Sequence, residues 1–324
     1  MDNSHLQSIL EEFHSKRIAV VGDVMLDIYH RGSVNRISPE APVPVVSIDS
    51  VEHHAGGAAN VAANLQSLGA GVDIFGVVGD DQNGNFLASD LQERQINING
   101  LLRDNSRATT AKTRVIAGSQ HVVRTDLENT NPLNEDLQAD LLNRIRSQIT
   151  SYDAIILQDY NKGVLQPPVI KAIIQECCEN DVLVTVDPKF INFYEYQDAN
   201  LVKPNLKEVR SILGRSITSD EEIQSAGQEL LEQLRADYLL ITLGAQGMEI
   251  FNRNGASERL PTQVKKVADV SGAGDTVIAT VTLALAAGAS LKEAAVLGNV
   301  AAGSVCEEVG IVPITLQSLQ NRLS

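Results

Sequence analysis

Short apolar runs, rich in β-branched residues, alternate with longer amphipathic segments along most of this 324-residue chain. Runs that are apolar throughout are typical of strands buried on both faces of a parallel sheet, and the segments between them have the period of helices. The alternation predicts an α/β fold with a doubly wound, mostly parallel sheet. We expect strands at 17–22, 72–78, 153–158, 182–187, 200–203 and 238–243. We expect helices at 58–68, 85–94, 135–149, 169–179, 206–213, 220–235, 274–287 and 291–307.

Two segments, 29–50 and 108–125, interrupt this alternation. The first holds three prolines ahead of a strand-like run, and the second has the pattern of two strands joined by a Gly-Ser turn. Neither leads directly into a helical pattern, so we expect both outside the main sheet. We predict one small β-lid built from these two insertions, and the alternative is a pair of unrelated surface hairpins. With no linker or repeat in the sequence, residues 1–324 are expected to form a single domain.

The net charge of the chain limits the classes of molecule that it could bind. The chain has 26 Lys and Arg against 41 Asp and Glu, a net charge of −15, so it would be repelled by nucleic acid and by anionic membrane surfaces. The acidic N-terminus lacks the apolar core of a signal peptide, and no stretch is apolar over the roughly 20 residues of a membrane span. The three cysteines form no CxxC pair. We expect a cytoplasmic protein that acts on a small molecule.

Several common enzyme signatures are absent from the sequence. It has no Walker A loop, no GxSxG nucleophile elbow and no HExxH zinc motif. Its first expected strand ends in GDVMLD rather than in a GxGxxG turn, which disfavours a Rossmann dinucleotide site there.

The strongest local feature is DVSGAGDT, residues 269–276, directly ahead of an expected helix. Gly272 and Gly274 permit a tight turn, and free amides at the start of the helix would bind an anion. Asp275 lies in the same turn. Its charge is unfavourable for anion binding alone, but it suits a base that deprotonates a hydroxyl attacking a phosphate. The alternative is an ordinary helix N-terminus with an acidic first turn.

Two more glycine clusters lie elsewhere in the chain. Gly56 and Gly57 open an expected helix with Asn60 one turn inside, an arrangement that suits recognition of a polyol and also close packing of small residues. Residues 241–248 place two glycines just after an expected strand. They form either a ledge against which a nucleotide lies or a plain β-turn.

Asn205 and Glu208 follow another expected strand, in the sequence KPNLKE. Their spacing is that of a capping box at the start of a helix. The same oxygen-bearing side chains, at the carboxyl end of a strand, also suit a phosphate-bound Mg²⁺ reached through water.

These four clusters, in this order, resemble the signatures of the ribokinase-type sugar kinases, also called the phosphofructokinase-B-like family. The first signature of that family is similar to GGAANVAANLQSLGA and the second to DVSGAGDTVIA, while NxxE and TLGxxG motifs match residues 205–208 and 242–247. The resemblance covers essentially the whole chain. It implies a ribokinase-like fold and an ATP-dependent carbohydrate kinase.

The resemblance also implies roles for individual residues. Asp275 would be the catalytic base, and the anion hole would consist of the amides of Gly272, Ala273 and Gly274. ATP would be bound by Asn205, Leu206, Lys207, Glu208, Thr242, Gly244, Gly247 and Asn299, with Mg²⁺ held through water by Asn205 and Glu208. The sugar would contact Asp27, Gly56, Gly57 and Asn60. A monovalent cation such as K⁺ and a homodimer formed through the β-lid are further expectations that come from the family.

Four longer segments resemble a narrower group, the kinases that phosphorylate D-glycero-β-D-manno-heptose 7-phosphate at O1. They are GDVMLDIYHRGSVNRISPEAPVPVV, RTDLEN, QDYNKGVL and VDPK. The product of such kinases is the 1,7-bisphosphate, an intermediate in ADP-heptose and lipopolysaccharide core synthesis. The phosphate already on the sugar needs cations, for which we predict Arg36, Arg124, Lys162 and Lys189, although each is equally an ordinary surface charge.

Four departures from that narrower pattern bear on the sugar rather than on the chemistry. Gln158 and Asn161 stand where serine and glycine are expected, and RTDLEN departs at Thr125 and Leu127. A kinase for another sugar, such as a fructose phosphate or ribose, is therefore an alternative, and a catalytically silent sugar- or nucleotide-binding regulator is a second. No HxGH-type motif is present, so we expect a stand-alone kinase with a separate adenylyltransferase downstream.

Overall fold

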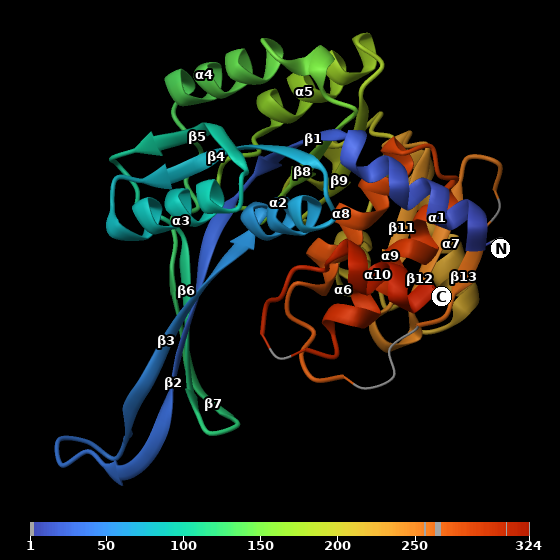
Figure 1. Cartoon of the computed structure of the whole chain (residues 1–324). Coiled ribbons are helices and arrows are strands. Elements are labelled where there is room, and N and C mark those ends of the chain that lie inside the picture. Colours follow the sequence, from blue (N-terminus) through green and yellow to red (C-terminus); the bar gives the residue numbers. More distant parts are fainter. Residues whose placement is uncertain (1–2, 256, 263–266, 309, 324) are drawn as a thin grey trace.

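A nine-stranded sheet forms the centre of the molecule, and helices cover both of its faces (Figure 1). The computed structural model describes residues 3–255, 257–262, 267–308 and 310–323. The strand order is β13-β12-β11-β10-β9-β8-β1-β4-β5, in which β12 runs antiparallel to its neighbours β11 and β13 and the other neighbouring pairs are parallel. The strands are β1 (Arg17–Gly22), β4 (Gly71–Gly79), β5 (Asn97–Asp104), β8 (Ala154–Gln158), β9 (Leu183–Asp187), β10 (Leu201–Val202), β11 (Tyr238–Thr242), β12 (Met248–Asn252) and β13 (Ser257–Leu260).

Each central strand contributes side chains to two separate cores, which explains why its sequence is apolar throughout. In β1, Ile18 and Val20 point into one core while Ala19 and Val21 point into the other, and all four are fully buried. The first core is covered by α1 (Asn3–Glu11), α2 (Ala58–Ser67), α3 (Gln82–Glu93), α8 (Ala273–Ala286), α9 (Leu291–Val305) and α10 (Leu316–Leu323). The second is covered by α4 (Glu135–Arg146), α5 (Pro167–Glu179), α6 (Leu206–Leu213) and α7 (Asp220–Leu234). The predicted doubly wound α/β fold is confirmed.

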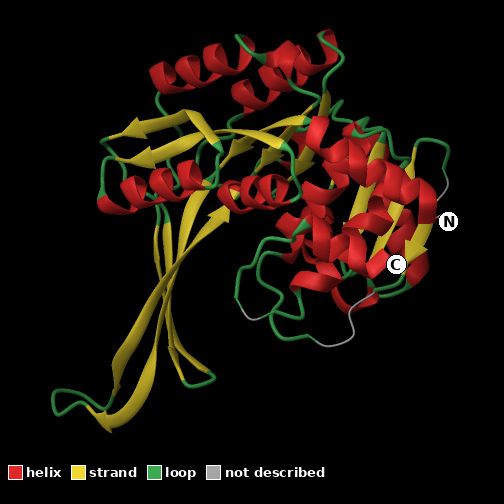
Figure 2. Ribbon diagram, in the orientation of Figure 1, coloured by secondary structure: helices red, strands yellow, loops and turns green. Residues whose placement is uncertain are grey.

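A second sheet of four strands projects from this body, as Figure 2 shows. Its order is β3-β2-β6-β7, and its strands are β2 (Val24–Ile37), β3 (Pro44–Gly57), β6 (Ala111–Ala117) and β7 (Gln120–Leu127). The β-lid is therefore one sheet built from two insertions, as predicted, rather than two separate hairpins. Its first insertion is longer than the expected 29–50, because β2 follows β1 almost at once and β3 runs directly into α2.

Some elements were not expected from the sequence. The antiparallel pair β12 and β13 extends one edge of the sheet, and β5, whose sequence NINGLLRD mixes polar with apolar residues, extends the other. Helices α1 and α10 pack against each other near the two ends of the chain. Among the helices in the described ranges, none combines the length and apolar character that a bilayer crossing requires.

Candidate active site

The carboxyl ends of the parallel strands meet at one edge of the sheet, where ligands bind in folds of this class. Asp23 follows β1, Gln158 ends β8, Asp187 ends β9 and Lys203 follows β10. All four side chains are buried, with 0 to 5% of their surface exposed. Helices α2 and α8 begin at the same edge and pack against each other. The topology thus collects polar groups from distant parts of the sequence around the start of α8.

Asp275, in the first turn of α8, is held by three hydrogen bonds. Its Oδ1 accepts from the Tyr160 hydroxyl at 2.8 Å and from Gln158 Nε2 at 3.1 Å, and its Oδ2 accepts from Asn60 Nδ2 at 2.8 Å. Only 5% of the residue is exposed. The predicted base is therefore rigidly placed. Asn60 donates to this carboxylate, and its predicted contact with a sugar stays a prediction.

Burial raises the pKa of Asp275 to about 6, and the neighbouring Asp187 carboxylate adds to the rise. The hydrogen bonds from Asn60 and Tyr160 and the charge of Lys203 act in the opposite direction. A carboxylate with this pKa is ionised above pH 6 and still basic enough to take a proton, which is the balance a general base needs. The predicted role of Asp275 fits this environment.

The turn ahead of α8 contains the residues predicted to form an anion hole. Gly272 is the N-cap of α8, adopts the left-handed conformation with φ 79°, and gives the helix no side-chain cap. Among the described residues no acceptor takes the amide protons of Gly272 and Gly274, whereas the Ala273 amide donates to Val270 O at 3.3 Å. Ala273 is thus a weaker member of the predicted hole than its neighbours. A Cβ on residue 272 would lie 2.8 Å from Asn60 Nδ2. Glycine is therefore needed at this position both for the positive φ and for the close approach of Asn60.

Lys203 supplies a cation beside this hole, which the sequence analysis did not assign. Its Nζ lies 3.1 Å from Asp187 Oδ2 and 3.6 Å from where a Cβ on Gly274 would be. The residue is 3% exposed. A buried ammonium group at this position favours an anion between itself and the amides of α8.

A cavity of about 660 Å³ opens next to the anion hole. The predicted nucleotide residues Asn205, Thr242, Gly244, Gly247 and Asn299 all line it, together with Ala273, Gly274, Val277, Ala302 and Cys306. Its size and mostly apolar wall suit a heterocyclic base. Two predicted members do not line the cavity and lie on α6: Lys207 is exposed, and Leu206 packs against the second core.

Asn205 and Glu208 form the capping box of α6, with both reciprocal hydrogen bonds present. Glu208 Oε1 also pairs with Lys189. Within the ranges that the structure describes, no group of three metal-binding side chains is found. Mg²⁺ is usually bound by one or two carboxylates together with phosphates and water, so a single Glu208 beside a phosphate site fits that ion. The capping role is thus observed, and the metal role stays a prediction.

The predicted sugar residues lie at the base of the β-lid. Asp27, on β2, is 4% exposed and pairs with Arg114 on β6. A Cβ on Gly56 would lie 2.3 Å from Asp27 Oδ2, so glycine allows this carboxylate to sit against β3. Gly57 is the N-cap of α2, with φ 56°.

The cations predicted for a distal phosphate differ in placement. Lys162 pairs with Glu128 at 2.7 Å and Lys189 with Glu208, both near the site. Arg124 is more than half exposed on β7 and pairs with Asp126 at 2.9 Å. Arg36 is exposed near the outer end of β2, nine residues and roughly 30 Å beyond Asp27. The prediction that Arg36 lines the site of its own chain is therefore wrong, because the strand carries it away from the body.

Lys112, on β6, is a further cation that the sequence analysis missed. Its Nζ lies 5.4 Å from the ring centre of Tyr160, and Lys189 Nζ lies 5.1 Å from the same ring. Burial lowers the pKa of Lys112, and no ion pair is made to it by any described residue. The sequence around Lys112 did not indicate this position. Lys112 comes close to Tyr160 only because β6 pairs with β2.

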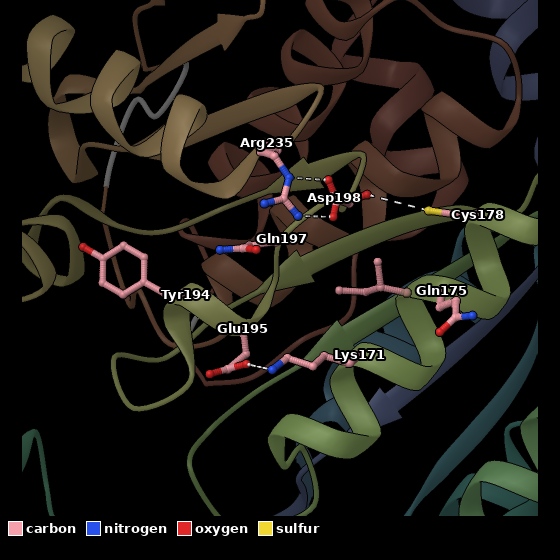
Figure 3. Close-up of a pocket in the computed structure, with 9 residues that line it drawn as sticks. Lys171, Gln175, Cys178, Tyr194, Glu195, Gln197, Asp198 and Arg235 are labelled. Atoms are coloured by element: carbon pink, nitrogen blue, oxygen red, sulfur yellow. Dashed lines mark hydrogen bonds and ion pairs between the residues drawn. The ribbon is translucent and has the colours of Figure 1, made fainter.

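A second hollow, of about 740 Å³, lies at the opposite edge of the sheet (Figure 3). Its charged groups are already paired, Lys171 with Glu195 at 2.8 Å and Arg235 with Asp198. Asp198 and Arg235 precede β10 and β11, so this hollow is at the amino ends of the strands. It is separate from the site around Asp275.

Comparison with known proteins agrees with this geometry. The pfkB family of carbohydrate kinases matches residues 15–316. The chain belongs to this family. It is accordingly an ATP-dependent sugar kinase, and the prediction made from its four motifs is confirmed at that level.

Relatives and solved structures extend the comparison. The bifunctional protein HldE of Coxiella burnetii is 43% identical over 96% of this chain, and the bifunctional protein HldE of a Nitratiruptor species is 44% identical over 94%. The chain covers 64% of the length of each. Phosphofructokinase-2 from Escherichia coli, solved with substrates and products, superposes with a TM-score of 0.78 at 20% identity over 95% of this chain and 98% of that one. Arabidopsis thaliana ribokinase, complexed with ribose and ATP, gives 0.76 at 18% over 95% and 99%. The ribokinase-like fold is therefore confirmed.

Proposed function

We propose that the chain phosphorylates D-glycero-β-D-manno-heptose 7-phosphate at O1, using ATP in the cytoplasm, as a step toward ADP-heptose and lipopolysaccharide core. The observation that carries this proposal is the position of Asp275. Gly274, beside it in sequence, lines the apolar cavity, and Tyr160, bonded to its carboxylate, contacts two lysines. A nucleotide on one side and a phosphorylated sugar on the other fit that arrangement. The HldE relatives and the heptose-kinase motifs support the choice of sugar.

The mechanism is an in-line transfer. Asp275 accepts the proton of the anomeric hydroxyl as that oxygen bonds to the γ-phosphorus and the bond to the ADP oxygen breaks. The amides of Gly272 and Gly274, with the Lys203 ammonium group, stabilise the charge on the transferring phosphoryl group. Asn60, Gln158 and Tyr160 fix the carboxylate. Mg²⁺, when bound near Glu208, would neutralise part of the phosphate charge. We also propose that the enzyme requires a monovalent cation such as K⁺.

The distal phosphate is proposed to bind Lys112, Lys162 and Lys189. Lys162 and Lys189 have carboxylate partners that a phosphate dianion would partly replace. Lys112 is half-buried and forms no ion pair with any described residue. Arg124 is a lesser candidate, because it is exposed and held by Asp126.

An assay of ADP release against a small panel of sugars tests the substrate. With Mg²⁺–ATP, we expect kcat/KM for heptose 7-phosphate to exceed that for fructose 6-phosphate, fructose 1-phosphate and ribose by at least about a hundredfold, because only the heptose satisfies both the base and the lysines. A blank without sugar reports ATP hydrolysis alone. Selective turnover of another sugar would keep the mechanism and discard the heptose, and turnover of none would favour the silent regulator.

We also propose that the β-lid pairs two chains into a homodimer. The lid extends beyond the body. It exposes apolar side chains on β2, β3 and β7: Val34 (40%), Ile37 (62%), Ile48 (42%), Val51 (48%), Val123 (49%) and Leu127 (53%). So many exposed apolar side chains on a projecting sheet are typical of a surface that another protein covers. The double variant Val123→Asp and Leu127→Asp should be monomeric by sedimentation, while Ile191→Asp, on an exposed site of the body, should stay dimeric. A monomeric wild-type protein would contradict the proposal.

A further inference from the structure

We propose that Tyr160 is a positioning residue for Asp275: its hydroxyl occupies Oδ1, which leaves Oδ2 as the oxygen that receives the proton from the substrate. This inference rests on the proposed role of Asp275 as base. It concerns which atom of the carboxylate reacts and what fixes that choice.

The hydrogen bonds around Asp275 select one oxygen. A carboxylate offers about four acceptor positions, two on each oxygen. The Tyr160 hydroxyl and Gln158 Nε2 fill both positions on Oδ1, at 2.8 and 3.1 Å. Oδ2 accepts only from Asn60 Nδ2, at 2.8 Å, among the described residues. One acceptor position therefore remains, and it is on Oδ2.

Tyr160 is itself held in place by a buried carboxylate. Asp23, 1% exposed, accepts the backbone amides of Tyr160 at 2.8 Å, Lys162 at 3.0 Å and Val164 at 3.3 Å. These three bonds hold the backbone of the segment that follows β8, and with it the position of Tyr160. Burial, with the nearby Asp275 charge, raises the pKa of Tyr160 well above its usual value, so the phenol keeps the proton that it donates to Asp275.

The charges around the pair come from several elements. Asp187 from β9 and Lys203 after β10 face Asp275, and Lys112 from β6 and Lys189 after β9 face the Tyr160 ring. The hydroxyl is the only part of Tyr160 that forms a hydrogen bond with the Asp275 carboxylate. Removal of the hydroxyl therefore leaves the ring and the surrounding charged groups in place. Tyr160→Phe therefore isolates one hydrogen bond to an ionised group.

The test is the pH dependence of kcat/KM. Activity of the wild-type enzyme should rise with pH through a midpoint near 6, because Asp275 works when ionised. Tyr160→Phe removes a bond that favours the ionised form, so its midpoint should move up by about one pH unit, and activity at pH 5.5 should fall roughly five- to tenfold more than at pH 8.5. A purely structural loss would lower activity by the same factor at every pH.

Two further proteins keep the test decisive. Tyr152→Phe, a buried tyrosine just ahead of β8 at the other edge of the sheet, is the matched control and should keep the wild-type midpoint. A fluorotyrosine placed at position 160 is nearly isosteric and a stronger donor, so its midpoint should move down. Unchanged midpoints for both changes at residue 160 would overturn the inference. If Asp275→Asn retained wild-type turnover, the proposed base would fail instead, and the two failures are thus distinguishable.

Discussion

Asp275→Asn is expected to lower kcat by about two to four orders of magnitude, with KM for ATP changed little. The amide has nearly the shape of the carboxylate and can still accept from Tyr160 and Gln158, but it cannot take the proton of the acceptor hydroxyl. Single-turnover measurement of phosphoryl transfer with the sugar that the panel identifies would report the chemical step directly. Turnover within threefold of wild type would refute the assignment of Asp275 as base.

The same variant should be at least as stable as wild type at pH 7.5. The pKa of Asp275 is about 6 in the folded protein against an ordinary 3.8, so the folded state holds a proton between these values that the unfolded state has lost. Stability therefore falls as pH rises through that window, and above pH 6 the ionised carboxylate costs folding roughly 1–3 kcal/mol. A neutral amide removes this cost. Thermal melts of both proteins at pH 5 and pH 7.5 would show a larger gain at the higher pH, and a large loss of Tm would mean that the variant is misfolded rather than inactive.

Much of the fold could be predicted because a strand that is buried on both faces is apolar at successive positions. The run at 17–22 is apolar at successive positions since Ile18 and Ala19 point into different cores. β5 lies at the edge of the sheet and only some of its residues are buried, so its sequence has no such apolar run. The lid strand β2 begins at Val24, ahead of the predicted lid segment 29–50, and its first residues, such as Met25 and Leu26, are buried beside the body.

The site was predictable only where local backbone geometry dictates residue type. Gly272 is required by its positive φ and by the approach of Asn60, and such requirements recur as a motif. Tyr160, Lys112 and Lys203 have no such local requirement. They meet because parallel strands end at one edge and because β6 pairs with β2, which are properties of the topology. The sequence pattern alone therefore pointed to Asp275 as the proposed base and missed most of the residues around it.

Lys112→Ala is expected to raise KM for the phosphorylated sugar by about ten- to a hundredfold, with kcat changed less than threefold. No described residue forms an ion pair with the ammonium group, and burial lowers its pKa despite the nearby charges of Asp27 and Asp126, so a bound phosphate would supply a close negative partner. A charge-assisted hydrogen bond of this kind contributes about 1.5–3 kcal/mol.

The decisive comparison is between two forms of one sugar. Lys112→Ala should bind heptose 7-phosphate more weakly and the unphosphorylated heptose as wild type does, because only the former carries the group that Lys112 contacts. Lys171→Ala, a lysine already paired with Glu195 at the far edge of the sheet, is the matched control and should leave both KM values unchanged. Equal losses for the two sugars would show that Lys112 supports the lid or the Tyr160 ring instead. No loss for either would assign the distal phosphate to Lys162 and Lys189, since these are the remaining cations near the ring of Tyr160 and the segment that Asp23 holds.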